Sequence, residues 1–140
     1  MTRRELILAA LAPAQGASHT PVQVQKLFFL IDRNIASQVE GPHFNFRPYH
    51  YGPFDEEVYQ ELNKLAASGH VDIDQGKWKT YRLTVTGQKE AEELLAKFDP
   101  KAADYIKRIS QFVRSLSFTK LVASIYKKYP EMRANSVFQG

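Results

Sequence analysis

The chain has 140 residues, of which 44% are hydrophobic and 24% charged, and none is cysteine. This length suits one ordinary globular domain, and the lack of cysteine excludes disulfides, thiolate metal ligands and cysteine nucleophiles within it. The net charge of +4 is mild, and its excess lies in residues 86–140, which hold ten basic and six acidic side chains. Charge alone therefore gives weak support for nucleic-acid binding.

Two helices are expected in the first forty residues. Thr2 is placed to cap a helix that ends near Leu11. The apolar run of this helix, from Leu6 to Leu11, is too short to cross a membrane and is not followed by a signal-peptide cleavage site. We therefore expect a cytoplasmic protein without a membrane partner. Thr20 and Pro21 form a typical start for a second helix. Its apolar positions 24, 27, 28, 31 and 35 recur with helical spacing up to the Gly-Pro pair at 41–42, which predicts the central core helix.

An aromatic stretch at residues 44–51 alternates loosely, which indicates a short extended segment that Pro48 restricts to an edge. Gly52-Pro53 is predicted to open a third helix, because proline suits a first helical turn. This helix has its apolar stripe at Val58, Leu62, Leu65 and Ala66 and ends at residues 68–69.

Residues 70–74 and 81–84 alternate on either side of a turn at 75–79, which predicts a β-hairpin. Thr86 is expected to cap a fourth helix. Three helices, a hairpin and a helix are the order of a winged helix-turn-helix, so the predicted fold class is α+β, mainly α, with a winged-helix domain over residues 1–98.

Two further helices are expected in a C-terminal extension over residues 99–140. The first begins after Asp99-Pro100, and its apolar residues at 102, 106, 109, 113 and 116 form a short seam that suits packing on the first domain or a homodimer contact. Ser117 caps the second, whose apolar stripe is Phe118, Leu121, Val122, Ile125 and Tyr129.

Several segments resemble known families. Tyr81–Gly87 is similar to the "Y-x-L-T-x-x-G" that joins wing to helix in bacterial winged-helix regulators. Gln25–Leu30 and Phe46–Phe54, with Ile125–Glu131, resemble an uncharacterised bacterial and archaeal winged-helix family with Q-K-L-x-F-L and F-x-P-Y-x-Y-G-P-F motifs. More distantly, the "Q-K-L" helix, the "Y-G-P" turn and Tyr59 resemble the Panacea (SocA-like) antitoxin domain. That resemblance implies a protein partner, a toxin, bound through protein contact.

Two uses of the surface stay open. For a protein partner, the candidate residues are acidic or aromatic: Glu56, Glu57, Tyr49, Tyr51 and Trp78. For double-stranded DNA, a dimeric regulator would read bases with the outward face of the third helix and grip phosphates with the wing. The candidate DNA contacts are Gln60, Asn63, Lys64, Lys77, Lys79 and Arg82.

Charge favours the protein partner, because residues 55–64 hold four acidic side chains and one lysine, and carboxylates repel phosphates. Trp78 suits a protein hot spot, a nucleic-acid contact, or packing back onto the helices. A structural role in a larger assembly is a third, weaker interpretation.

No pattern in the chain indicates an enzyme. The four histidines lack metal-ligand spacing, and the seven glycines are scattered at turns without forming a phosphate loop. We therefore expect no catalytic residue, metal or cofactor, and predict a non-enzymatic regulatory binding module.

Overall fold

Helices dominate an α+β fold over residues 1–139, the part of the chain that the computed structural model describes. The helices are α1 (Arg3–Leu11), α2 (Pro21–Asn34), α3 (Glu56–Ala67), α4 (Val85–Ala96), α5 (Pro100–Ser115) and α6 (Phe118–Lys128). The strands are β1 (Arg47–Tyr49), β2 (Gly52–Phe54), β3 (Val71–Asp74) and β4 (Thr80–Leu83), and 3₁₀ turns η1, η2 and η3 lie at Ala12–Ala14, Ala36–Val39 and Pro130–Arg133. Strands β1–β2 and β3–β4 form two separate antiparallel hairpins.

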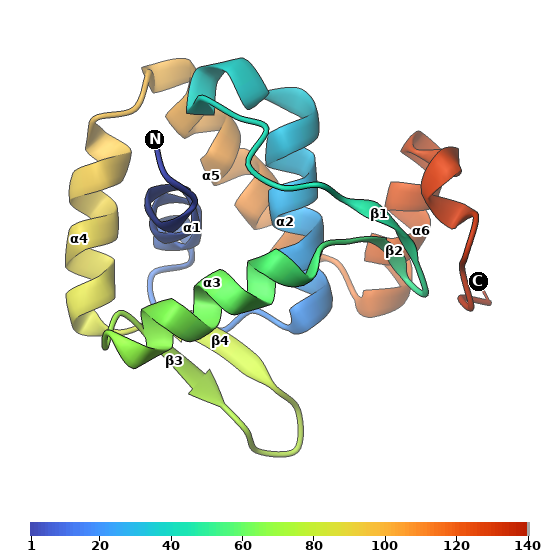
Figure 1. Cartoon of the computed structure of the whole chain (residues 1–140), viewed down its shortest axis with the longest axis horizontal. Coiled ribbons are helices and arrows are strands. Elements are labelled where there is room, and N and C mark those ends of the chain that lie inside the picture. Colours follow the sequence, from blue (N-terminus) through green and yellow to red (C-terminus); the bar gives the residue numbers. More distant parts are fainter. Residues whose placement is uncertain (140) are drawn as a thin grey trace.

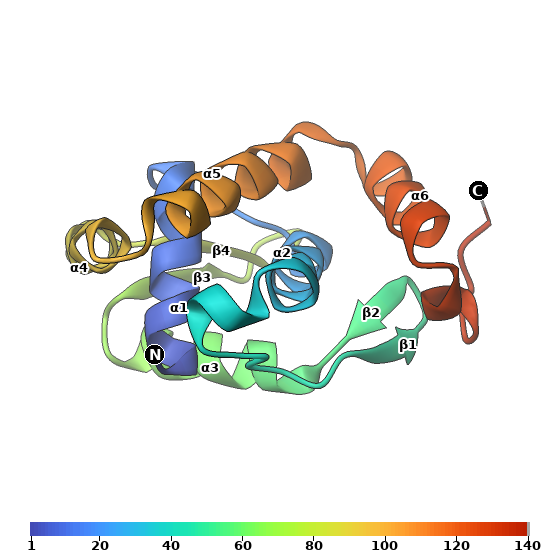
Figure 2. The same ribbon diagram turned by 90° about the horizontal axis from the view of Figure 1, so that it is seen from above.

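Helices α1 and α2 form the middle layer of the molecule (Figure 2). Helix α5 lies across one side of this pair and α3 lies across the other, while α4 packs against α1 and crosses it. Every residue from Leu6 to Leu11 is buried, as are Leu27 and Phe28 of α2. A second apolar cluster joins Phe29 of α2 to the inner face of α6 at the far end of the molecule. No helix among residues 1–139 has the length and apolar character to cross a membrane.

Both predicted N-terminal caps are confirmed. Thr2 and Thr20 each accept a backbone N–H three residues on, and Glu5 and Gln23 bond back to them in capping boxes. The predicted end of the second helix near residue 41 is wrong, since α2 ends at Asn34.

The chain turns earlier because Asp32 holds the segment that follows. Its carboxylate accepts the backbone N–H groups of His43 at 3.0 Å and Phe44 at 2.8 Å. Residues 36–39 form η2, and Glu40 then takes a left-handed conformation with φ of 57°.

The prediction that Gly52-Pro53 opens the third helix is also wrong. Gly52 has φ of 106°, outside the helical region, and residues 52–54 form β2, which pairs with β1 around the turn at residues 50–51. Helix α3 begins three residues later because Asp55 is its cap, with Oδ1 accepting the N–H of Glu57 at 2.9 Å. The extended segment predicted around Pro48 is thus one strand of a hairpin.

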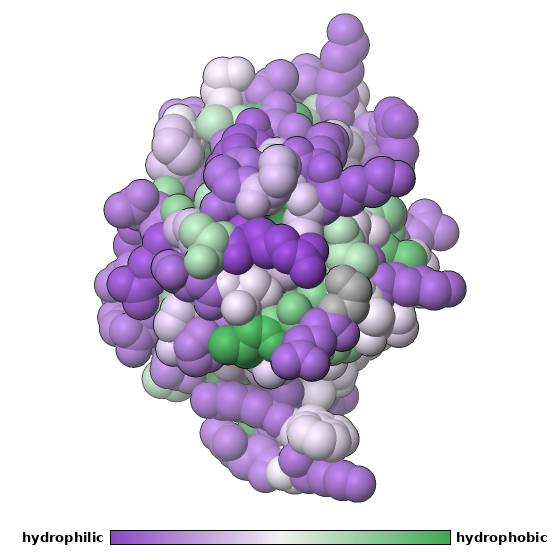
Figure 3. Space-filling view, turned by 90° about the vertical axis from the view of Figure 1, so that its right-hand side faces the viewer, coloured by the Kyte–Doolittle hydropathy of each residue, from purple (hydrophilic) through white to green (hydrophobic). Residues whose placement is uncertain are grey.

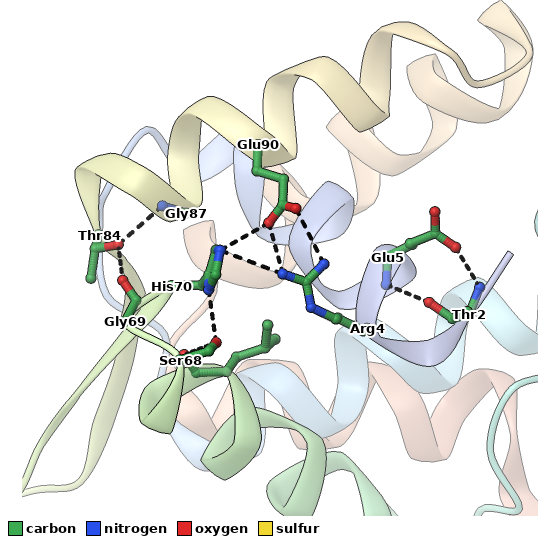
Figure 4. A network of polar contacts seen from close by, with 10 residues as sticks. Thr2, Arg4, Glu5, Ser68, Gly69, His70, Thr84, Gly87 and Glu90 are labelled. Atoms are coloured by element: carbon green, nitrogen blue, oxygen red, sulfur yellow. Dashed lines mark hydrogen bonds and ion pairs between the residues drawn. The ribbon is translucent and has the colours of Figure 1, made fainter.

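The expected hairpin at residues 70–84 is confirmed, but the cap of the following helix is Thr84, not Thr86. Thr84 Oγ1 accepts the N–H of Gly87 at 3.0 Å and donates to the carbonyl of Gly69 at 2.7 Å (Figure 4). A side chain at Gly87 would collide with the carbonyl of His70. The threonine and glycine of the "Y-x-L-T-x-x-G" segment thus hold α4 against the start of the hairpin.

A polar network ties α1, α4 and the turn before β3 together (Figure 4). Glu90 accepts two hydrogen bonds from Arg4, the shorter at 2.9 Å, and lies 3.1 Å from His70 Nε2. Ser68 Oγ lies 2.7 Å from the other ring nitrogen, Nδ1. These contacts fix where the β3–β4 hairpin leaves the helical body.

The connection between α1 and α2 joins the second hairpin. His19 and Tyr81 exchange two backbone hydrogen bonds, 2.7 and 2.9 Å long, which make an antiparallel bridge to β4. The His19 side chain is fully buried, and neither ring nitrogen has a hydrogen-bond partner among the described residues. Burial, aided by the charge of Arg114, lowers the pKa of its imidazole to about 4, so the ring is neutral at pH 7.

The apolar seam of α5 packs inside the chain. Ala102, Ile106 and Val113 are buried, and the other two seam residues are half-buried. The seam is thus not a free face for a second copy. On α6 the predicted stripe is buried except at Phe118, which is 46% exposed and packs edge-on against Tyr51 at 5.1 Å between ring centroids.

Candidate functional site: an exposed hairpin, an open helix face and a buried lysine

Helix α3 presents an open polar face to solvent. Glu56, Gln60, Asn63 and Lys64 are all exposed, as the sequence predicts for its outward face. Glu57 is half-buried, and its carboxylate lies 3.4 Å from Arg3 of α1. Val58, Leu62 and Leu65 are buried on the opposite side, which fixes the orientation of the helix.

Trp78 lies in the loop that closes the β3–β4 hairpin, and 72% of its side chain is exposed. The hairpin projects from the body beside α3 (Figure 1) and forms the lower protrusion in Figure 3. The interpretation that Trp78 packs back onto the helices is therefore wrong. The nearest cation is Lys77, whose Nζ lies 5.7 Å from the ring centroid, close enough for a weak cation–π attraction.

Two of the four cations predicted for DNA contact are paired with carboxylates. Arg82 forms an ion pair with Asp72 across the hairpin at 3.0 Å, and Lys64 lies 3.4 Å from Glu61. Within residues 1–139, Lys77 and Lys79 have no ion pair. The surface formed by α3 and the β3–β4 hairpin thus carries nearly balanced charge.

Tyr49 and Tyr51 lie away from Trp78, on the other hairpin (Figure 1). They are 40% and 41% exposed. Tyr49 stacks on His50 at 4.2 Å and on Phe54 at 4.8 Å between ring centroids. The residues predicted from sequence as one partner surface are therefore divided. Trp78 lies on the β3–β4 hairpin and the tyrosines on the β1–β2 hairpin, and Glu56 begins α3 directly after the latter.

Sequence analysis missed a buried lysine beside these tyrosines. Lys26 on α2 is only 3% exposed, and its Nζ has one hydrogen-bond acceptor, the carbonyl of Pro53 at 3.3 Å. Loss of solvation lowers the pKa of its ammonium to about 7. The only sequence signal was a lysine inside an otherwise apolar helix, and an exposed position would explain that equally well.

The Q-K-L segment of α2 and the Y-G-P segment of the β1–β2 hairpin meet at this point. The neighbouring Gln25 is also buried, and its amide accepts the N–H of Asp55 at 3.0 Å and donates to the Asp55 carbonyl at 3.0 Å. The Gln-Lys pair of α2 thus bonds to Pro53 and Asp55 and holds the C-terminal half of β2 in place. This gives the motif a structural role whatever its function.

Ser68, His70 and Glu90 form a chain of close polar contacts with the composition of a hydrolase triad. The backbone around the serine opposes catalysis, however. The N–H groups of Ser68, Gly69 and His70 all donate to carbonyls of α3, so none is available to stabilise an oxyanion. Arg4 also occupies Glu90 with two hydrogen bonds. We assign this chain to holding the hairpin in place.

Among residues 1–139 no group of three or more histidine and acidic side chains is arranged to hold a metal ion. Comparison of the chain with models of known families, with curated proteins and with solved structures found no match.

Proposed function

We propose that this protein is a winged-helix binding module. The order α1, α2, α3, β3, β4, α4 supports this class, with α3 as the third helix and residues 75–79 as the wing. The His19–Tyr81 bridge adds support, because it places a short third extended segment beside β4. The chain differs from a short helix-turn-helix in the long connection between α2 and α3, which includes the β1–β2 hairpin.

The module binds a protein through the face formed by α3 and the wing. The observation that carries this proposal is the 72% exposure of Trp78 on a projecting hairpin beside an acidic helix. Exposed tryptophans are costly in water and are strongly enriched among residues that dominate binding energy. Glu56, which is exposed and has no ion pair among the described residues, suits a partner with basic residues around an apolar pocket. The resemblance to Panacea suggests that this partner is a toxin and that the role is regulatory.

DNA is the second candidate, and one observation favours it. Lys77 and Lys79 flank Trp78 on the wing without ion pairs among the described residues, so they are available to phosphates. Glu56 and Glu57 oppose this use, because the third helix would carry them toward the DNA backbone. Protein binding therefore accounts for more of the surface.

Photocrosslinking tests the proposal without a known partner. A photoreactive phenylalanine analogue replaces Trp78 in one variant and Gln111, exposed on α5, in a matched control. We expect a discrete protein adduct at position 78 that is absent at 111. An adduct at 78 that disappears after nuclease treatment would instead favour DNA, and equal adducts at both positions would contradict a specific face.

A further inference from the structure

A pocket of about 250 Å³ lies between α2 and the β1–β2 hairpin. Most of its wall is apolar or aromatic: Pro21, Val22, Tyr49, Tyr51, Pro53 and Phe54. Lys26 also lines the pocket, and among the described residues it is the one lysine in the lining. Acidic side chains are absent from its lining.

The Lys26 amine has unused hydrogen-bonding capacity. An ammonium has three N–H donors, and within residues 1–139 the only acceptor is the Pro53 carbonyl. Gln25 is not available to it, because both ends of its amide bond to Asp55. The other titratable groups in the lining are His50 and three tyrosines. Tyr126 of α6 lies beside the pocket, and the Arg47 guanidinium lies 5.8 Å from the ring centroid of Tyr49 in its wall. None of these is a carboxylate that would neutralise the lysine.

Gly52 keeps the space around the lysine open. A Cβ atom at this position would lie 3.3 Å from Lys26 Cε and 3.5 Å from a ring carbon of Tyr126. The φ of 106° also favours glycine here. The hairpin thus brings backbone close to the amine without covering it with a side chain.

We propose that this pocket binds a small organic carboxylate, with the acid group on Lys26 Nζ and the apolar body against the aromatic wall. A buried cation without an anionic partner favours an anion strongly, because desolvated charges attract more than exposed ones. The volume is below that of most drug-sized sites, so the ligand is a small one. This inference does not depend on the proposed protein-binding role of α3 and the wing.

Binding of a carboxylate at Lys26 should be coupled to the uptake of a proton by its amine. At pH 8 most of the Lys26 amine is neutral, because its pKa is about 7. A carboxylate stabilises the ammonium form and raises that pKa. Binding at pH 8 should therefore take up close to one proton, whereas binding at pH 6 should take up almost none.

Calorimetric titration with benzoate, and with benzamide as its uncharged match, tests this assignment. We expect saturable benzoate binding, benzamide weaker by about tenfold or more, and loss of benzoate binding in Lys26→Met. The exposed Lys127→Met is the matched control and should bind benzoate like the wild type.

Proton uptake is measured on the wild type alone, from the binding enthalpy at pH 8 in buffers of different ionisation enthalpy. This arm needs no variant and so is independent of any folding defect. Equal binding of benzoate and benzamide, benzoate binding by Lys26→Met, absence of proton uptake, or absence of benzoate binding at millimolar concentration would each overturn the proposal.

Discussion

Replacing Lys26 by methionine should stabilise the protein. Methionine is also long and unbranched, so it can follow the same path through the core without a charge. In the folded chain the ammonium has a pKa of about 7, against an ordinary value of 10.5. At 1.36 kcal/mol per pKa unit, the buried lysine costs about 4 kcal/mol at pH 7. Loss of the hydrogen bond to Pro53 offsets about 1 kcal/mol of this stabilisation. We therefore expect the free energy of unfolding of Lys26→Met to be higher by about 3 kcal/mol.

The buried Lys26 also makes the free energy of unfolding depend on pH. The folded-state pKa of Lys26 is the lower one, so the unfolded chain binds more protons between pH 7 and pH 10.5. The free energy of unfolding of the wild type should therefore rise with pH across this window, by up to about 1.4 kcal/mol per unit. Below pH 7 both states are protonated, and the lysine contributes no further slope.

Urea denaturation of both proteins at pH 6.5, 8 and 9.5 measures the effect. The stability advantage of Lys26→Met should be largest at pH 6.5 and shrink steadily toward pH 9.5, while Lys127→Met follows the wild type. The reasoning is refuted if Lys26→Met is less stable than the wild type at pH 7, or if its advantage does not change with pH. A lysine that costs stability in this way suits a site retained for binding.

Three further predictions concern other parts of the molecule. Burial lowers the pKa of His19 from 6.5 to about 4. The free energy of unfolding of the wild type should therefore fall by about 3 kcal/mol as pH falls across that range. Acid denaturation of His19→Leu should not show this loss. Gly87→Ala should cost several kcal/mol because of the His70 carbonyl, whereas Gly69→Ala, with open space but φ of 82°, should cost only about 1–2 kcal/mol; equal thermal shifts would contradict this. Random duplex DNA, followed by fluorescence polarisation, should give a log–log salt slope no steeper than about −2, because two wing lysines are unpaired; a slope near −6 would restore the DNA interpretation.

Local signals in the sequence predicted most of the helical framework. The caps at Thr2, Thr20 and Ser117 and the apolar periodicity of the helices act between residues a few positions apart, so they are visible in one sequence. The β3–β4 hairpin was equally visible from its alternation. The outward face of α3 followed directly from the buried stripe on its other side.

The errors arose where distant residues decide the structure. Gly52-Pro53 resembles a helix start, but pairing with β1 and the clamp from Gln25 hold it extended. Both Thr84 and Thr86 could cap the helix, and Thr84 does so because its hydroxyl also donates to the carbonyl of Gly69. The buried state of Lys26 depends on contact with a segment almost thirty residues away, which no local pattern records.

A protein-binding face formed by Trp78 and α3 should lose most of its affinity when the indole is removed. The protein captured by crosslinking at position 78 is purified, and its affinity is measured by calorimetry for the wild type and two alanine variants. Trp78→Ala should weaken binding by about 30-fold or more, as a hot spot worth 2 kcal/mol does, without changing the melting temperature. Phe112→Ala, at a comparably large exposed residue on α5, should leave the affinity nearly unchanged. Wild-type affinity in Trp78→Ala would contradict the account.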